Sequence, residues 1–130
     1  MLEKNITKLI LIKASKLGAR LFRNNTGTGW VGKIKRTKGG GIYIEEPRPL
    51  IAGLCVGSSD LIGWTEKIIT KDMVGEKIAI FTALEIKTPR GKPSKEQLNF
   101  IRIVNDSGGI AGIAKNIEDA ENIILKNEQP

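Results

Sequence analysis

The sequence contains no histidine, a single cysteine and no long apolar run. Without histidine, imidazole metal ligands, histidine general bases and Ser-His-Asp triads are excluded. One cysteine, Cys55, excludes an internal disulfide and fits a reducing compartment. No apolar run reaches the roughly 18 residues of a membrane span, and the N-terminus lacks the apolar region of a signal peptide. We therefore expect a cytoplasmic protein whose catalysis would depend on carboxylates, lysine, hydroxyls or a metal with oxygen ligands.

Acidic residues are also few relative to basic ones. Twenty-one Lys and Arg stand against 14 Asp and Glu, which gives a formal net charge of +7. This excess favours a polyanionic partner, and nucleic acid ahead of an anionic membrane because no long basic amphipathic helix is visible. Many small basic proteins carry charge only for solubility, so that alternative stays open. At 130 residues, with 40% hydrophobic and 27% charged residues, the chain is expected to form one domain with its own core.

Helical and strand patterns alternate along the chain and predict an α/β domain with a mixed sheet. Three segments have the apolar spacing and end signals of helices: residues 2–17 before Gly18, a segment from Ser94 with a Ser94-x-x-Gln97 capping box that ends at Gly108-Gly109, and a segment from Asn116 to about Lys126. Strands are expected at 19–25, 60–64, 76–87 and 110–114, with the second and third as antiparallel neighbours.

The region between the first two strands is predicted to be largely irregular. Residues 27–41, GTGWVGKIKRTKGGG, are rich in glycine and lysine. Their first six residues match G-x-G-x-x-G, but the dinucleotide-binding motif needs a helix directly after the glycines, and none is expected here. We predict a mobile basic loop over a polyanion, or an open hairpin with residues 42–44, in which Trp30 stacks on a base or fills the core. Residues 45–60 are expected to be irregular, because two prolines argue against a helix at their start.

The strand at 76–87 ends in Leu84-Glu85-Ile86-Lys87. Because residues i and i+2 of a strand point to one side, at a rise of about 3.3 Å per residue, Glu85 and Lys87 share a face. Asp60 follows Gly57-Ser58-Ser59 and precedes an apolar strand, so its carboxylate is expected where a loop enters the sheet. Two carboxylates that converge on Mg²⁺ can activate water and polarise a phosphoryl group, and a nearby lysine can orient or deprotonate that water. A strand-end salt bridge is the alternative, because this pattern alone is weak.

Three stretches, GSSDLIG, LEIKTPRGKPSKEQ and SGGIAGIAKNIEDA, resemble the virus-type replication-repair nuclease (VRR-NUC) family of the PD-(D/E)xK superfamily. The resemblance runs from the first helix to the last and implies a single VRR-NUC-like domain over residues 1–130. It implies a restriction-endonuclease-like core, with a central mixed β-sheet flanked by α-helices. It also implies Mg²⁺- or Mn²⁺-dependent hydrolysis of DNA phosphodiester bonds. The Pro-Asp of the superfamily is Ser59-Asp60 here, and this departure leaves the ligand itself in place.

The resemblance also implies roles for individual residues. Asp60 and Glu85 match the metal ligands, with the backbone carbonyl of Ile86 as a third oxygen, and Lys87 matches the catalytic lysine. Gln97 matches an active-site glutamine of the family, and the capping box itself is the alternative.

Glu3 matches a glutamate that the family carries on its first helix near the metal site. Its helical spacing to Ile10, Ala14 and Leu17 places it on the side that leans toward the sheet. A first-turn acid that stabilises the helix dipole is the alternative for Glu3.

DNA contacts are expected from basic residues in turns and in the basic loop: Arg23, Lys33, Lys35, Arg36, Lys38, Arg90 and Lys92. Asn24 and Asn25, beside Arg23, are further candidates for phosphate contacts, although asparagine is common in turns. Stand-alone members of the family resemble Holliday-junction resolvases that act as homodimers, which implies branched DNA as the substrate and a homodimer. Apolar residues within 27–51 would then need a surface to cover, such as a partner subunit. The alternatives are a flap or end-processing nuclease, a monomer, and a non-catalytic basic DNA-binding module.

Overall fold

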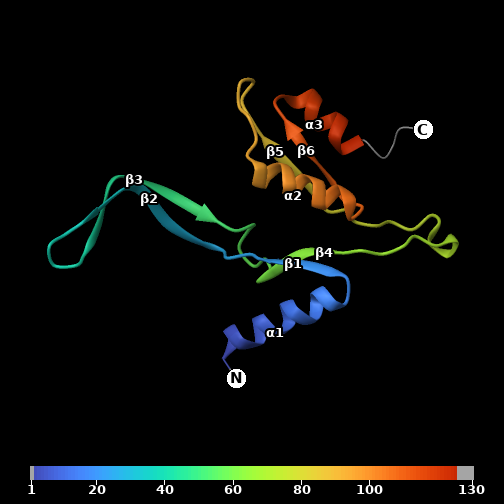
Figure 1. Ribbon diagram of the computed structural model, residues 1–130, viewed down its shortest axis with the longest axis horizontal. Coiled ribbons are helices and arrows are strands. Elements are labelled where there is room, and N and C mark those ends of the chain that lie inside the picture. Colours follow the sequence, from blue (N-terminus) through green and yellow to red (C-terminus); the bar gives the residue numbers. More distant parts are fainter. Residues whose placement is uncertain (1, 126–130) are drawn as a thin grey trace. The chain divides into compact units, whose positions relative to one another are not determined.

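The computed structural model describes residues 2–125 (Figure 1). The elements follow in the order α1 (Glu3–Lys16), β1 (Ala19–Arg23), β2 (Gly27–Arg36), β3 (Ile42–Ala52), β4 (Leu61–Thr65), the 3₁₀ helix η1 (Lys71–Met73), β5 (Thr82–Ile86), α2 (Lys95–Asp106), β6 (Ile110–Ala114) and α3 (Ile117–Ile124). The chain divides into two compact units, Met1–Gly63 and Trp64–Pro130, which are described separately below. In the part of the chain that the structure describes, no helix is long and apolar enough to cross a membrane.

In the first unit, α1 contacts β1, and β1 pairs with β4. Gly18 follows α1 with φ of 82°, the left-handed conformation predicted for the residue that ends this helix. The half-buried residues Leu11 and Ala14 lie on one face of α1. A Cβ atom added at Gly63 would lie 1.8 Å from the carbonyl oxygen of Arg20, so β4 can approach β1 this closely only with glycine at that position.

Strands β2 and β3 form an antiparallel hairpin, which Figure 1 shows extending away from β1 and α1. Of the two alternatives for residues 27–41, a mobile loop or an open hairpin with residues 42–44, the structure shows the hairpin. The prediction of irregular structure for residues 45–52 is wrong, because these residues belong to β3. Gly32 lies at a register shift, where a Cβ atom would meet the carbonyl oxygen of Glu45 at 2.5 Å. Pro47 and Pro49 lie in β3, and a strand of a two-stranded ribbon has an open edge that needs no N–H donor. In this hairpin, Gly32 thus lies at a bulge, and Pro47 and Pro49 lie in a strand with an open edge, so neither residue type prevents strand formation here.

In the second unit, β5 and β6 pair in parallel, and α2 connects them. Both α2 and α3 pack on β6. Among residues 2–125, the buried hydrophobic side chains all belong to α2 and β6: Val104, Ile110, Ala111 and Ala114. A Cβ atom at Gly112 would lie 2.7 Å from the side chain of Ile123, so this glycine allows α3 to approach the strand. Ser94 caps α2 with the predicted capping box, and Asn116 caps α3.

The strand pairing differs from the prediction in two respects. Strand β4 pairs with β1 and β5 pairs with β6, so the predicted antiparallel pairing of residues 60–64 with 76–87 is wrong. Strand β5 is also shorter than predicted and starts only at Thr82. The mixed α/β class is confirmed, whereas the central mixed sheet stays a prediction, because the strands of residues 2–125 form three two-stranded sheets. The single domain over residues 1–130 also stays a prediction, and Lys126 and the NEQP end lie outside the described residues.

Candidate active site

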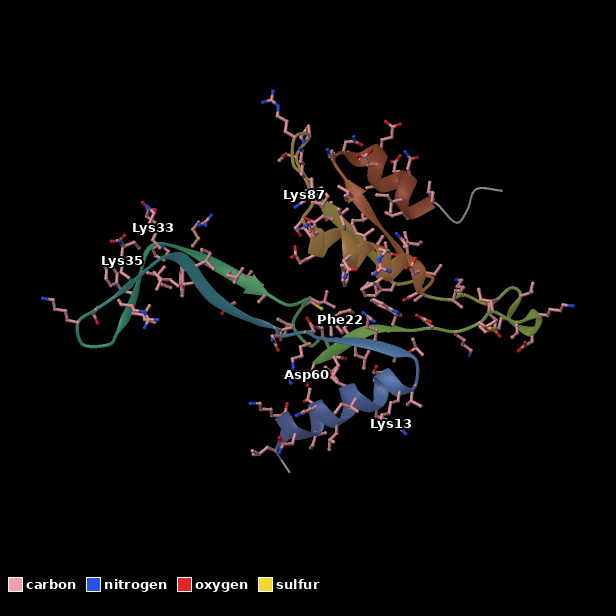
Figure 2. The ribbon with its side chains drawn as sticks, in the orientation of Figure 1. Lys13, Phe22, Lys33, Lys35, Asp60 and Lys87 are labelled. Carbon is pink, nitrogen blue, oxygen red and sulfur yellow. The ribbon has the colours of Figure 1, made fainter. Side chains whose placement is uncertain are left out.

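Glu85 and Lys87 form a close ion pair at the end of β5. The Lys87 Nζ atom lies 2.9 Å from Glu85 Oε1, and the two side chains are only 20% and 30% exposed. Lys87 directly follows β5, but its backbone N–H still donates to the carbonyl oxygen of Ala114 at 3.1 Å, so the ladder with β6 continues through it. Figure 2 shows Lys87 at this end of the strand. The shared strand face predicted for the two residues therefore produces a direct and partly sheltered contact.

Gln97 joins the start of α2 to this ion pair. Its Oε1 atom accepts from the backbone N–H of Ser94 at 2.8 Å, which is one half of the capping box. Its Nε2 atom donates to Glu85 Oε1 at 2.7 Å. A backbone N–H can only donate and a carboxylate can only accept, so the orientation of the amide follows from its partners. The two alternatives for Gln97 are an active-site role and the capping box; the cap is present, and the other end of the same amide reaches Glu85, while the active-site role stays a prediction.

Both contacts of the glutamate fall on the same oxygen. Lys87 and Gln97 reach Glu85 Oε1, and neither contact involves Oε2. A carboxylate has about four lone-pair sites, so Oε2 retains the capacity to bind water or a cation. A pocket of about 300 Å³ adjoins this carboxylate, and Glu96 on the first turn of α2 also lines it. Sequence reasoning missed Glu96, although its position directly before Gln97 could have suggested it.

Asp60 lies where the sequence predicted, at the end of a loop and immediately before β4. Its backbone carbonyl oxygen accepts from the N–H of Asn24 at 2.9 Å, and its side chain is exposed. Asp60 belongs to the first unit, whereas Glu85, Lys87 and Gln97 belong to the second. The structure thus brings the last three together, and the convergence of Asp60 with them stays a prediction. Within residues 2–125, no three Asp, Glu or Cys side chains gather as a ready metal site.

The sequence profile of the VRR-NUC domain matches residues 49–116, more than half of the chain. The chain belongs to the VRR-NUC family. The family is part of the PD-(D/E)xK nuclease superfamily, whose members usually use divalent metals, and membership indicates a nuclease that acts on DNA. The matched stretch includes Asp60, Glu85, Lys87 and Gln97, and it excludes α1 and most of the hairpin. No curated protein and no solved structure matches the chain.

Glu3 and Ile86 are the two remaining residues that were predicted to belong to the metal site of this VRR-NUC protein. Glu3 begins α1, is exposed, and lies one helical turn before the half-buried Thr7. The spacing grouped Glu3 with Ile10, Ala14 and Leu17 on the side toward the sheet, but of these four residues only Ala14 is half-buried and the others are exposed. Glu3 also lies in the first turn, where an acid favours the helix dipole. Ile86 is the last residue of β5 and pairs with Ala114. The roles of Glu3 and of the Ile86 carbonyl in metal binding stay predictions.

The basic residues of the β2–β3 hairpin are exposed and partly paired. Lys33 Nζ lies 3.0 Å from Glu46, and Lys35 Nζ lies 3.9 Å from Glu45. Both lysines project from the hairpin in Figure 2. Exposed ion pairs of this kind contribute about 0–1 kcal/mol, so a DNA phosphate could compete with the glutamates for these lysines. Arg36 ends β2, and Lys38 lies in the turn that follows it, within the segment predicted to contact DNA.

The remaining predicted DNA contacts lie in other parts of the chain. Arg90 and Lys92 are exposed in the turn that follows β5. Lys115, which sequence reasoning did not single out, supports this turn by donating from Nζ to the carbonyl oxygen of Pro89 at 3.1 Å. Arg23 is the last residue of β1 and is also exposed. DNA binding by these residues stays a prediction.

Asn24 requires a correction. Its Nδ2 atom donates to Ser58 Oγ at 2.7 Å and to the carbonyl oxygen of Ser59 at 2.9 Å. Because a side-chain amide has two N–H donors, both are used within the protein and none is left for a phosphate. The prediction of a phosphate contact by the side chain of Asn24 is therefore wrong.

Proposed function

We propose that this protein is a Mg²⁺- or Mn²⁺-dependent DNA endonuclease with Glu85 and Lys87 at its active site. The observation that carries the proposal is the cluster of Lys87 and Gln97 on one oxygen of Glu85, at the end of β5. A plain surface salt bridge would explain the lysine, but it would not explain the amide donor from α2. Two side chains, Lys87 just after β5 and Gln97 on α2, thus hold the Glu85 carboxylate in one orientation, as a metal ligand requires.

The donor set fits a hard divalent cation. The chain has no histidine, and the candidate ligands are the carboxylates of Asp60 and Glu85 and the backbone carbonyl of Ile86. Oxygen donors of this kind are those that Mg²⁺ and Mn²⁺ prefer. When bound, such an ion lowers the pKa of a water molecule and offsets charge on the phosphoryl group. Glu85 Oε2, which accepts from neither Lys87 nor Gln97, is the oxygen that we assign to the ion.

Lys87 provides the positive charge of the proposed site. Its Nζ atom is held beside Glu85 by the 2.9 Å contact and is only partly exposed, so the ammonium has little freedom to move away. From this position, a proton on Nζ can be donated to a phosphate oxygen as negative charge develops there. It can also orient the attacking water by a hydrogen bond. Gln97 restrains the carboxylate itself and thereby keeps Oε2 in a constant direction.

We further propose branched DNA as the substrate and a homodimer as the active form. A junction resolvase makes two symmetric nicks, and a domain with one site can do so only as a pair. The hairpin offers a surface that a partner subunit could cover. Its register places Ile34, Ile42 and Ile44 on one face, and Ile34 and Ile42 are 66% and 59% exposed. A two-stranded hairpin with such a face is marginal in water by itself. A cytoplasmic location belongs to the same proposal.

The nuclease is tested with labelled linear, flap and four-way-junction DNA, incubated with Mg²⁺, Mn²⁺ or EDTA. We expect cleavage that requires the metal and favours the junction. Glu85→Ala and Lys87→Ala should each reduce the cleavage rate by about two orders of magnitude. DNA binding should persist in both variants, because basic residues supply most of the affinity. Glu121→Ala removes an exposed glutamate of α3 and is the matched control, expected to cleave like the wild type.

Each alternative gives a different result in this assay. Wild-type cleavage by Glu85→Ala would overturn the assignment of the active site. Binding without cleavage of any substrate, at any metal concentration, would identify a non-catalytic basic DNA-binding module. Cleavage of the flap in preference to the junction would identify a flap nuclease and leave the metal chemistry in place.

A further inference from the structure

The segment that leads to Asp60 needs an external restraint. Residues 53–60 connect β3 to β4 and form no helix or strand. Gly53 and Gly57 have φ of 85° and 84°, and glycines in this region give an unrestrained chain many alternative conformations. Asp60 is the last residue of the segment. The position of its carboxylate therefore depends on what holds the backbone in front of β4.

Asn24, the residue directly after β1, holds this segment at both ends. Its Oδ1 atom accepts from the backbone N–H of Leu54 at 3.0 Å. Its Nδ2 atom donates to Ser58 Oγ at 2.7 Å and to the carbonyl oxygen of Ser59 at 2.9 Å. Its own backbone N–H donates to the carbonyl oxygen of Asp60 at 2.9 Å. Four hydrogen bonds from one residue thus bind the beginning and the end of the segment to the end of β1.

The chemistry of the partners selects asparagine at this position. The N–H of Leu54 can only donate and the carbonyl oxygen of Ser59 can only accept, so the side chain must offer an acceptor and a donor at once. Aspartate would keep the acceptor for Leu54 but would place a negative charge against the Ser59 carbonyl. Ser58 extends the network, because its Oγ atom donates to the carbonyl oxygen of Cys55 at 2.7 Å.

We propose that Asn24 is a positioning residue that holds Asp60 in its metal-binding orientation before the ion binds. The inference rests on the proposed function in one respect, namely that Asp60 is a metal ligand. Residues that orient a ligand from the outer shell of a metal site typically affect metal affinity by about 10- to 100-fold. An asparagine that only stabilised the loop would affect folding stability and leave the metal affinity unchanged, so the two roles can be separated.

The test measures Mn²⁺ binding to the 130-residue chain without DNA, by the electron paramagnetic resonance signal of free Mn²⁺. The variants are Asn24→Ala, Asn24→Asp and Asp60→Ala. The matched control is Asn105→Ala, because the Asn105 amide binds the backbone of Ala111 in the same two-sided way, with contacts of 2.9 and 3.0 Å. Asn105 lies on α2 and is not among the proposed site residues. Hydrogen exchange of the Leu54 amide reports directly on the restraint.

We expect Asn24→Ala to raise the Kd for Mn²⁺ by about 10- to 100-fold and Asn24→Asp to raise it less. Leu54 exchange should become faster in Asn24→Ala only, and Asn105→Ala should keep a Kd within about twofold of the wild type. A wild-type Kd in Asn24→Ala, together with weaker binding by Asp60→Ala, would overturn the inference and leave the proposed function intact. A wild-type Kd in Asp60→Ala would overturn both the inference and the assignment of Asp60 as a metal ligand, without affecting the roles of Glu85 and Lys87. If Asn24→Ala did not fold, Asn24→Asp would decide: a raised Kd supports the inference, and an unchanged Kd overturns it.

Discussion

The contact between Gln97 and Glu85 should be measurable as a coupling free energy that does not depend on any nuclease activity. The perturbations are Gln97→Ala and Glu85→Ala, made singly and together, with unfolding by urea followed at 25 °C in EDTA. Hydrogen bonds to charged groups contribute about 1.5–3 kcal/mol. The Glu85 side chain is 30% exposed, and its Oε1 atom contacts both Gln97 and Lys87. We therefore expect a smaller coupling free energy between Gln97 and Glu85, of about 1 kcal/mol. At a urea slope of about 2 kcal/mol per molar, the coupling corresponds to about 0.5 M in the unfolding midpoint.

Ser94→Ala supplies the control for the helix cap. Ser94 Oγ accepts from the Gln97 N–H at 3.1 Å, and loss of an N-cap acceptor costs about 1 kcal/mol. The cap contact does not include Glu85, so the coupling of Ser94→Ala with Glu85→Ala should be near zero. Additivity holds within about 0.3–0.5 kcal/mol for independent sites. A Gln97–Glu85 coupling inside that range, or one equal to the Ser94–Glu85 coupling, would refute the reasoning, because Gln97 would then act only as a cap.

Two further predictions concern the hairpin. Replacement of Lys33, Lys35, Arg36 and Lys38 by Gln should weaken DNA binding and reduce the slope of log affinity against log salt by up to about four. The ion pairs of Lys33 and Lys35 with Glu46 and Glu45 are exposed and weak, so all four residues should contribute to the change. An unchanged slope would mean that these charges face away from the DNA. Sedimentation equilibrium at micromolar protein without DNA should show a dimer of the 14.2 kDa chain, and Ile34→Lys should shift it to monomer. A monomeric wild type that nicks only one strand of a junction would exclude the dimer without affecting the proposed chemistry.

The features that the sequence predicted well depend on residues that are close together in the chain. The cap of α2 is made by Ser94 and Gln97, three residues apart, and the ion pair of Glu85 with Lys87 follows from the two-residue period of a strand. Gly18 ends α1 because the left-handed conformation is easily reached by glycine. In each case, local backbone geometry determines which atoms meet, so the residue types and their spacing were sufficient.

The features that the sequence did not predict depend on partners far along the chain. Gly27 pairs with Ala52, and nothing in the residue types of 27–41 distinguishes a loop from one strand of a long hairpin until the second strand is present. The sequence predicts a turn or a phosphate contact for Asn24 and not its true partners, because Leu54, Ser58 and Ser59 lie 30 to 35 residues away. Glycine and proline indicate only which local backbone conformations are accessible. The register of a strand and the hydrogen-bond partners of a side-chain amide depend on which distant segment packs against them. The sequence alone therefore determined the local caps and the Glu85–Lys87 pair, and only the tertiary structure decided the strand partners and the restraint on Asp60.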